Sequence, residues 1–441
     1  MTKQSQQSGN LVAIIMMIIL FGMISFVTNL AAPMGQVLKE QFGYTNFQGL
    51  MGNMANFIAY AVMGIPGGIL LQKVGYKKTA LIAIAIGFVG VFIQFLSGHA
   101  SHASAFGVYL LGAFVAGFSM TLLNTVVNPM LNKLGFDQGK AKGKSDEDAN
   151  NEGNQLIQVG GSFNSIMATF TPAFVGILIG EAAKAKITDV FPVMYIAMGV
   201  FALVFFVLWA VTIPEPTMAR SSEPLGKLIS GALKFRHFIL GAVGIFVYVG
   251  VEVGTAGILI LWLSDNPAVG KTIAGTVAGT YWFLMLVGRL TGAAIGNKVS
   301  AKMMLTVTTI VGLILVTLAM LPTTTQISLP VFQSTDAGLS FGLANVPIYA
   351  MYLVLIGLCT SIMWGSIFNL AVQGVGKYLE AASGIFMVLV CGGGILPAIQ
   401  GFIADKAGYQ ISYVVIFLGL AYLLFYALVG SKNVNKNIKV D

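Results

Sequence analysis

The stretch LVAIIMMIILFGMISFVTNLAAPM, from Leu11 to Met34, contains 24 residues and no charged side chain. A helix crosses the hydrocarbon core of a bilayer, about 30 Å thick, with about 20 such residues. Because lipid offers backbone amides no hydrogen-bond partner, a run of this length has to be helical. The run exceeds the apolar core of a signal peptide, about 7–15 residues, so we expect it to be retained as a first membrane helix.

Apolar runs of similar length follow along the whole chain. Hydrophobic residues make up 56% of the 441 residues and charged residues 9%, against about 25% charged residues in soluble domains. So few charges cannot cover a water-facing surface. The sequence therefore predicts an all-α membrane protein with twelve transmembrane helices, at residues 11–37, 47–71, 78–97, 105–132, 156–180, 191–213, 237–263, 272–296, 302–321, 345–374, 381–403 and 410–430.

The basic residues are divided unequally between the two sides of these helices. With the N-terminus inside, 18 of the 24 Lys and Arg residues fall in the inner segments, five fall in the outer loops, and Arg289 lies within a helix. Cytoplasmic loops of membrane proteins carry an excess of Lys and Arg. This bias predicts an even number of helices, both termini in the cytoplasm, and a multi-pass protein of the inner (plasma) membrane.

The polar segment 214–236 divides the chain into two sets of six helices. We expect an N-terminal six-helix bundle over 1–213, a cytoplasmic linker over 214–236, and a C-terminal bundle with a short cytoplasmic tail over 237–441. In each half, glycines and then a basic turn end the second helix, at 67–78 and at 288–298. Related halves are typical of alternating-access carriers, which bind their solute near the midplane between the halves.

Two clear charges lie within the predicted helices, Glu252 and Arg289. Charged groups are costly in a bilayer and usually face the bundle interior or a functional path. Glu252, isolated in the apolar run 246–254, is the candidate for coupling solute movement to a cation; the alternative is a protonated carboxyl that only ties helices together. We expect gating or structural roles for Arg289, whose fork suits a fixed carboxylate partner, and for Lys73 in the basic turn after the second helix.

Neutral amides are the second polar signal inside the predicted helices. An amide both donates and accepts hydrogen bonds, as sugar hydroxyls do, so an amide-lined cavity with an aromatic platform suits a sugar. The alternatives are hydrogen bonds between helices for the amides and a place in the interfacial belt for the tryptophans. The predicted substrate-binding residues are Asn29, Asn56, Asn124, Asn128, Gln158, Asn164, Trp282, Trp364 and Asn369.

Signals of other protein classes are missing from the sequence. It has no phosphate-binding loop that would couple ATP, no Cys/His cluster for a metal and no nucleophile–base pattern, so we expect neither an enzyme nor an ATP-driven pump. The two cysteines, Cys359 and Cys391, lie in apolar runs and imply no disulfide framework. We expect no cofactor or metal beyond a coupling H⁺ or Na⁺, no nucleic-acid partner, and a monomer in the lipid bilayer.

Several short segments resemble the fucose permease and glucose/galactose permease branch of the major facilitator superfamily, and the resemblance covers nearly the whole chain. It is carried by Thr45-Asn46-Phe47-Gln48, Pro66-Gly67-Gly68-Ile69-Leu70, Asn128-Pro129, Ser162-Phe163-Asn164-Ser165, Tyr248-Val249-Gly250-Val251-Glu252, Gly392-Gly393-Gly394-Ile395 and Gly401-Phe402-Ile403-Ala404-Asp405. The resemblance implies the major facilitator fold, with twelve helices in two pseudo-symmetric six-helix bundles. It also implies secondary active sugar transport, with cation symport.

The chain departs from the fucose permease pattern at two acids. In that family, an acid in the first helix and another in the fourth are thought to couple a proton to the sugar. This sequence has Ala31 and Ala32 at the first place and Asn124 at the second. Glucose/galactose carriers also have an acid at the position of Glu252, so the resemblance favours a hexose such as glucose or galactose over fucose. Proton coupling, sodium coupling and uniport remain open.

Two other functions compete with sugar transport. A major facilitator efflux carrier for lipophilic compounds would have a large apolar pocket, and the amide-rich helices speak against one. A sugar sensor that binds without transporting would usually carry an interaction domain or a long tail, whereas 12 residues follow Val429.

Overall fold

The structure is a computed structural model that describes residues 3–42, 46–179, 187–213, 223–335, 338–435 and 437–438. Its elements are α1 (Lys3–Phe42), α2 (Asn46–Val74), α3 (Tyr76–Ser97), α4 (His102–Ala141), α5 (Asp146–Ile179), η1 (Ile187–Val190), α6 (Phe191–Ala210), α7 (Leu225–Ala232), α8 (Arg236–Ser264), α9 (Gly270–Ile295), α10 (Ala301–Ala319), β1 (Gln326–Thr335), β2 (Gly338–Pro347), α11 (Ile348–Thr360), α12 (Met363–Val372), η2 (Gly376–Tyr378), α13 (Leu379–Leu389), α14 (Gly392–Ala407), α15 (Tyr409–Ser412), α16 (Val414–Phe425) and η3 (Tyr426–Gly430).

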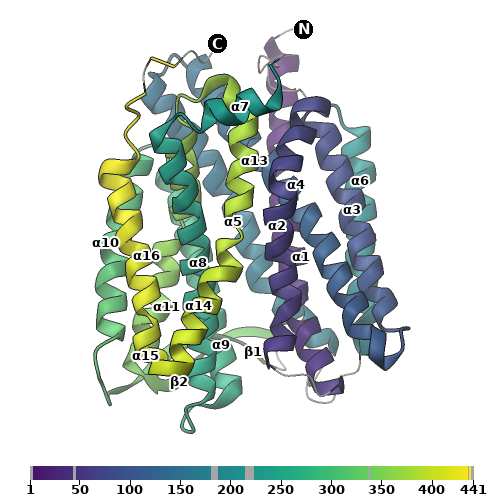
Figure 1. The fold of residues 1–441 in the computed structure, drawn as a ribbon, viewed down its shortest axis with the longest axis vertical. Coiled ribbons are helices and arrows are strands. Elements are labelled where there is room, and N and C mark those ends of the chain that lie inside the picture. Colours follow the sequence, from purple (N-terminus) through teal and green to yellow (C-terminus); the bar gives the residue numbers. More distant parts are fainter. Residues whose placement is uncertain are drawn as a thin grey trace.

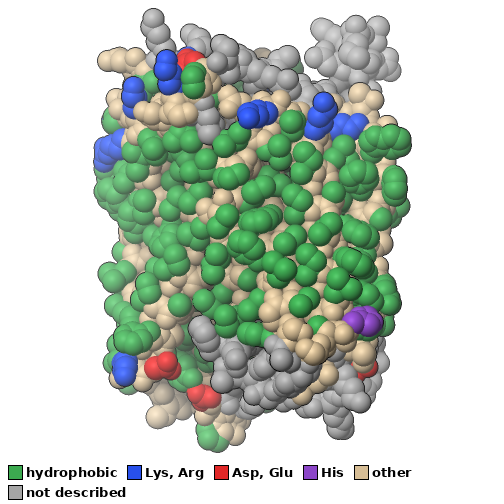
Figure 2. Space-filling view, turned by 45° about the vertical axis from the view of Figure 1, so that its right-hand side comes forward, with side chains coloured by type: hydrophobic (Ala, Val, Ile, Leu, Met, Phe, Trp, Pro, Cys, Tyr) green, Lys and Arg blue, Asp and Glu red, His purple; other side chains and the backbone are tan. Residues whose placement is uncertain are grey.

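The prediction of a helical membrane protein is confirmed. Within the described ranges, eleven helical segments are long and apolar enough to cross a membrane. Helix α5, with 34 residues, adds a twelfth, which agrees with the twelve runs counted in the sequence. Figure 2 shows the surface that this composition creates: a broad apolar area across the face in view, with most of the Lys and Arg side chains of that face near the upper end. On α6, Leu203, Phe206 and Trp209 are each more than 60% exposed, as helices facing lipid require.

The helices form two groups that stand side by side (Figure 1). In the first, which we call the N-terminal group, α4 packs against α2 and α3, and α1 packs against α5. In the C-terminal group, α8 packs against α14, and α9 against α11. The groups are joined chiefly by α2 with α13 and by α5 with α9, and to a lesser extent by α4 with α13, α5 with α12 and α2 with α14. The beginning of α1 and the end of η3 lie at the same end of the molecule, which we call the termini end.

The contact between α2 and α13 depends on glycine. A Cβ atom on Gly64 would lie 2.6 Å from the backbone nitrogen of Val388, and one on Gly384 would lie 3.2 Å from the Cα of Gly68. Small residues allow helix backbones to approach closely in lipid. The glycines that end the second predicted helix therefore bring the two groups into backbone contact.

The basic turn after α2 has a structural role. Gly75 has a φ of 84°, a left-handed conformation that glycine adopts without steric cost. Two residues later, the Lys77 ammonium donates to the carbonyls of Trp209 (2.9 Å) and Val211 (2.6 Å). A cation at a helix C-terminus complements the helix dipole. The turn thus ties the end of α6 to the start of α3.

The tenth and eleventh predicted helices are broken, although we predicted each as one continuous run. The first break separates α11 from α12 at Ser361–Ile362, and the second separates α13 from α14 at Val390–Cys391. The second break precedes three glycines, where a Cβ on Gly392 would lie 2.0 Å from the carbonyl oxygen of Phe246. Hydropathy cannot locate such breaks, because the residues around them are as apolar as those of a continuous helix.

A second difference is the hairpin of β1 and β2, in a region predicted as an outer loop that led into a helix at residue 345. The strands are antiparallel, with Leu329 opposite Ala344. These two residues are buried, whereas Phe341 and Leu343, on the other face, are 60% and 75% exposed. The alternation has the period of a half-buried strand. The hairpin lies at the end opposite the termini (Figure 1).

Candidate functional site

Arg289, on α9, lies where the two groups meet and is 7% exposed. Its guanidinium donates to the carbonyl of Ser361 in its own group (Nε, 3.1 Å) and to the carbonyl of Gly161 in the N-terminal group (Nη1, 3.0 Å). It also donates to the amide oxygen of Asn164 (Nη1, 3.0 Å), and its Nη2 lies 3.4 Å from Oε1 of Glu252. One side chain therefore joins α5, α8, α9 and the break before α12.

Glu252, on α8, is the acid of this site, and its side chain is 14% exposed. A charge is tolerated inside a membrane protein when it is paired and hydrogen-bonded, and Arg289 supplies the opposite charge. The Tyr281 hydroxyl donates to the backbone carbonyl of Glu252 (3.1 Å) and lies 3.1 Å from the Thr360 hydroxyl. The two membrane charges that the sequence singled out for separate roles thus form one ion pair.

Asn164 connects this pair to the first helix. Its amide oxygen accepts from Arg289, and its Nδ2 donates to the carbonyl of Phe21 on α1 (2.9 Å). Asn164 thus links Arg289 to α1 as well as α5 through two hydrogen bonds.

A second chain of hydrogen bonds crosses between the groups through neutral side chains. Asn124 donates to the Tyr60 hydroxyl (2.8 Å), and Asn128 donates to the side-chain oxygen of Asn124 (3.2 Å). The oxygen of Asn128 accepts from the indole Nε1 of Trp364, on α12 (2.9 Å). The Trp364 ring in turn contacts the Tyr248 ring, with centroids 6.2 Å apart. Neutral donors and acceptors arranged in this way can bind hydroxyl groups without adding charge.

Comparison with proteins of known structure identifies the fold. The chain aligns with the crystal structure of the E. coli fucose:proton symporter at a TM-score of 0.75, over 96% of this chain and 100% of that one, with 18% identity. It also aligns with the structure of a major facilitator superfamily transporter in the outward conformation, at a TM-score of 0.73 over 94% of this chain and 99% of that one. The chain therefore has the major facilitator fold.

Sequence comparison gives relatives that match nearly the whole length of the chain. It is 29% identical to the glucose/galactose transporter of Brucella abortus, over 98% of this chain and 97% of the relative. It is 28% identical to a putative glucose/galactose transporter of Helicobacter pylori J99, over 97% and 98% of the two chains. The L-fucose-proton symporter of Escherichia coli K12 is 21% identical, over 84% of this chain and 82% of that one. No family model matches the sequence.

The major facilitator fold brings together most of the predicted site residues. Asn164 meets Glu252 and Arg289, and Asn124 and Asn128 meet Trp364, as described above. Gln158 donates to the carbonyl of Ile362 in the C-terminal group (3.0 Å).

Other predicted residues lie apart from these two clusters. Asn369 donates to the backbone of Asn150 (3.0 Å), nearer the termini end. Asn56 is 2% exposed, and its oxygen has no hydrogen-bond partner among the described residues. Lys73 is exposed, and the side chain of Asn29 lies outside those that the structure describes.

Trp282 differs from Trp364 in its surroundings. It is half-buried and stands edge-on to the neighbouring Tyr281 ring, with centroids 5.2 Å apart. In the described part of the chain its indole nitrogen donates no hydrogen bond, whereas that of Trp364 is held by Asn128. Of the two tryptophans predicted to bind substrate, Trp282 is thus the one whose indole nitrogen makes no hydrogen bond to a described residue.

Sequence reasoning missed several members of the site. Tyr60 and Tyr281 carry hydroxyls that hold Asn124 and the Glu252 backbone, yet a tyrosine in an apolar run looks like any core aromatic residue. Thr360 and Ser361 mark the helix break. Their only sequence signal is a Thr-Ser pair inside an apolar run, which is weak.

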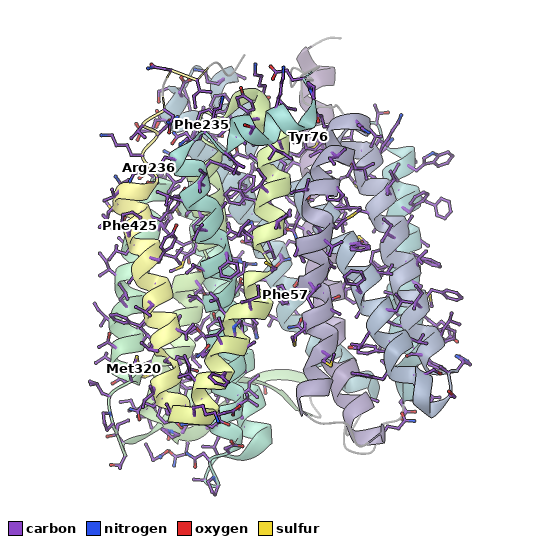
Figure 3. The ribbon with its side chains drawn as sticks, in the orientation of Figure 1. Phe57, Tyr76, Phe235, Arg236, Met320 and Phe425 are labelled. Atoms are coloured by element: carbon purple, nitrogen blue, oxygen red, sulfur yellow. The ribbon has the colours of Figure 1, made fainter. Side chains whose placement is uncertain are left out.

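The hydrogen bonds described between the two groups lie in the halves of the helices nearer the termini end. On α5 they run from Asn150, near its start, to Asn164, at about its middle, and on α9 they include Ala293, which accepts from Gln155 (2.9 Å). Near mid-height, the Phe57 ring of α2 packs at the start of α14, where a Cβ on Gly393 would lie 2.6 Å from it; Figure 3 labels this side chain between the groups. The described contacts therefore close the termini end.

Proposed function

We propose that this protein is a secondary active sugar transporter that moves a hexose by alternating access, with glucose and galactose as the first candidates. Two observations support the proposal. Relatives that match nearly its whole length are named as glucose/galactose transporters, and a layer of neutral amides, hydroxyls and one ion pair lies between its two helix groups. Hexoses are uncharged and rich in hydroxyls, so such a layer fits them better than lipophilic compounds.

The proposal gives the structure a place in the transport cycle. The hydrogen bonds at the termini end hold that side shut, so the structure corresponds to a state that faces the other side. The excess of Lys and Arg near the termini end (Figure 2) supports termini in the cytoplasm of an inner-membrane protein. The described state would then receive sugar from outside the cell, as a monomer with two groups that rock about the central layer.

We assign the coupling of transport to the ion pair of Glu252 and Arg289. In the described state Arg289 binds Glu252 and, through Gly161 and Asn164, the N-terminal group. A proton or Na⁺ that neutralises the carboxylate would weaken the hold of Glu252 on the guanidinium. The contacts of Arg289 with the N-terminal group would then change, and the cation would bias the equilibrium between the two states. The amides of Asn124, Asn128 and Asn164 and the indole of Trp282 are the proposed sugar contacts.

Uptake by the purified protein in proteoliposomes tests the proposal. Labelled glucose, galactose, fucose and 2-deoxyglucose would be offered under a proton gradient, a sodium gradient or neither. Accumulation above equilibrium under one gradient supports symport, and equilibration without accumulation would indicate a uniporter. Binding without uptake would indicate a sensor, and movement of lipophilic dyes with no hexose uptake would indicate an efflux carrier.

A further inference from the structure

The break between α11 and α12 interrupts the hydrogen bonding of a membrane helix. Inside a bilayer, freed backbone carbonyls need other donors. Arg289 donates to the carbonyl of Ser361 (3.1 Å), and Gln158 donates to that of Ile362 (3.0 Å), which also accepts from the backbone nitrogen of Ser366 (3.2 Å). One of the donors at the break therefore comes from the opposite helix group.

Gln158 reaches this carbonyl through a slot between two glycines of the C-terminal group. A Cβ on Gly365 would lie 2.6 Å from Nε2 of Gln158, and one on Gly292 would lie 3.6 Å from its Cδ. The Gln158 side chain is 2% exposed. Side chains larger than hydrogen at these two positions would narrow or fill the slot.

The ten residues of α12 are held by the N-terminal group at two further points. Trp364 donates to Asn128 (2.9 Å), and Asn369 donates to the carbonyl of Asn150 (3.0 Å). Helix α11, on the other side of the break, packs instead against α9 and α10 of its own group. Helix α12 packs against α8 and α10 of its own group and also against α5 of the N-terminal group. The break thus separates a helix bound within the C-terminal group from one bound on both sides of the seam, the contact surface between the two groups.

We propose that Gln158 is a positioning residue that holds α12 against the N-terminal group and so sets how readily the termini end opens, rather than a ligand of the sugar. The proposal rests on the transport function proposed above. Opening the seam withdraws Gln158 from the Ile362 carbonyl, which keeps its bond from Ser366, and leaves the amide of Gln158 to find another partner in water. While the seam is closed, the glycine slot leaves no room for a sugar hydroxyl at this amide.

The first test is Gln158→Leu, which keeps most of the volume and removes the donor. In a background with both native cysteines replaced by alanine, Asn154→Cys on α5 reports access from the termini end through its labelling by a membrane-impermeant thiol reagent, because Asn154 is buried and its side chain meets Met304 of the C-terminal group (Nδ2 to Sδ, 3.5 Å). A hydrogen bond between membrane helices averages about 0.6 kcal/mol, so labelling should rise about threefold. The hexose dissociation constant of the detergent-solubilised protein should stay within about twofold, while the net uptake rate changes.

Gln410→Leu is the matched control. It removes the same kind of bond, from Gln410 Nε2 to the carbonyl of Met320 (2.7 Å), but within one group. Labelling of the cysteine should then stay at the starting level. An equal rise in both variants would mean that Gln158 contributes only general stability, and would overturn the proposal. A weakening of hexose binding by tenfold or more in Gln158→Leu, with labelling unchanged, would make Gln158 a sugar ligand and also overturn it.

Gly365→Ala displaces Gln158 without changing it. This variant should reproduce the rise in labelling alone and add nothing to Gln158→Leu, since both act on one contact. If the two substitutions raise labelling additively, they act at different contacts, and the proposed slot for Gln158 is wrong. Labelling requires no sugar, so it distinguishes the two proposals: wild-type protein that binds no hexose contradicts the transport function, while the labelling pattern still tests the role of Gln158.

Discussion

Replacing Glu252 by glutamine removes the negative charge of the central ion pair and keeps an oxygen beside Arg289. The guanidinium retains its bonds to Ser361, Gly161 and Asn164, at 3.0–3.1 Å. Removing one partner of a buried pair costs about 3–5 kcal/mol. Because the contact between the charges is long, at 3.4 Å, and the new amide oxygen still accepts, we expect a loss near the value of a charged hydrogen bond, about 1.5–3 kcal/mol. The variant should therefore fold and insert.

Two transport assays separate the roles of this carboxylate. Accumulation of hexose against its gradient requires the cation step, so Glu252→Gln should abolish it. Exchange of labelled for unlabelled hexose at equal concentrations requires only the movement of the loaded carrier, so it should persist. Glu147→Gln, at an exposed acid, is the control and should leave both assays unchanged. If Glu252→Gln accumulates hexose with the same dependence on pH and sodium as the wild type, the carboxylate has no part in coupling.

A double variant tests whether the two charges depend on each other. Arg289→Met alone strands Glu252 without its cation and should lower thermal stability more than Glu252→Gln does. Combining the two removes the uncompensated charge and should recover part of that stability. The double variant should still fail to accumulate hexose. If the destabilisations of the two single variants add, the groups do not act as a pair.

Two further predictions concern the frame around the site. Burial raises the pKa of Glu152, but hydrogen bonds from Lys144 and Lys142 outweigh burial and hold this pKa below its ordinary 4.5. The pairing of Glu152 with these lysines should therefore stabilise the corner where the end of α4 meets the start of α5 at pH values above 4.5. This stabilisation should be lost as the pH falls through the lowered pKa. Hydrogen exchange of the corner's backbone amides measures this, and a pH profile identical to that of a variant with both lysines changed to glutamine would contradict it. Gly392→Val should prevent folding, because its Cβ would lie 2.0 Å from a backbone oxygen, whereas Gly257→Val, with open space around the Cβ, should fold normally by size-exclusion chromatography.

The helices were predictable because lipid imposes one rule on every span. A run such as 11–34 has no alternative to a helix, and the Lys and Arg residues of the basic turns predict which ends of the helices face the cytoplasm. The site residues were predictable for the same reason: polar groups such as Glu252 and Asn128 stand out against an apolar background. Their partners were not, because pairing depends on which faces of helices distant in the chain come together.

Gln158 and Asn369 show the limit of this reasoning. From the sequence, an amide that binds sugar and an amide that binds a facing helix look alike, since both need one donor and one acceptor. For Gln158, the two kinds of amide are distinguished only by Gly365, which lies beside it on a helix about 200 residues away in the chain. The hairpin was missed because its short alternation competes with stronger apolar runs on both sides.

The seam between α2 and α13 has a further consequence. At Gly64 and Gly384 the backbones of the two groups touch without a side chain between them. This contact leaves little space for a continuous chain of water molecules. If only polar contacts closed the space between the two groups, water at those contacts would give protons a path across the membrane. If transport is coupled to a cation as proposed, we expect its leakage along this side to be small and to be prevented mainly along α5 and α9.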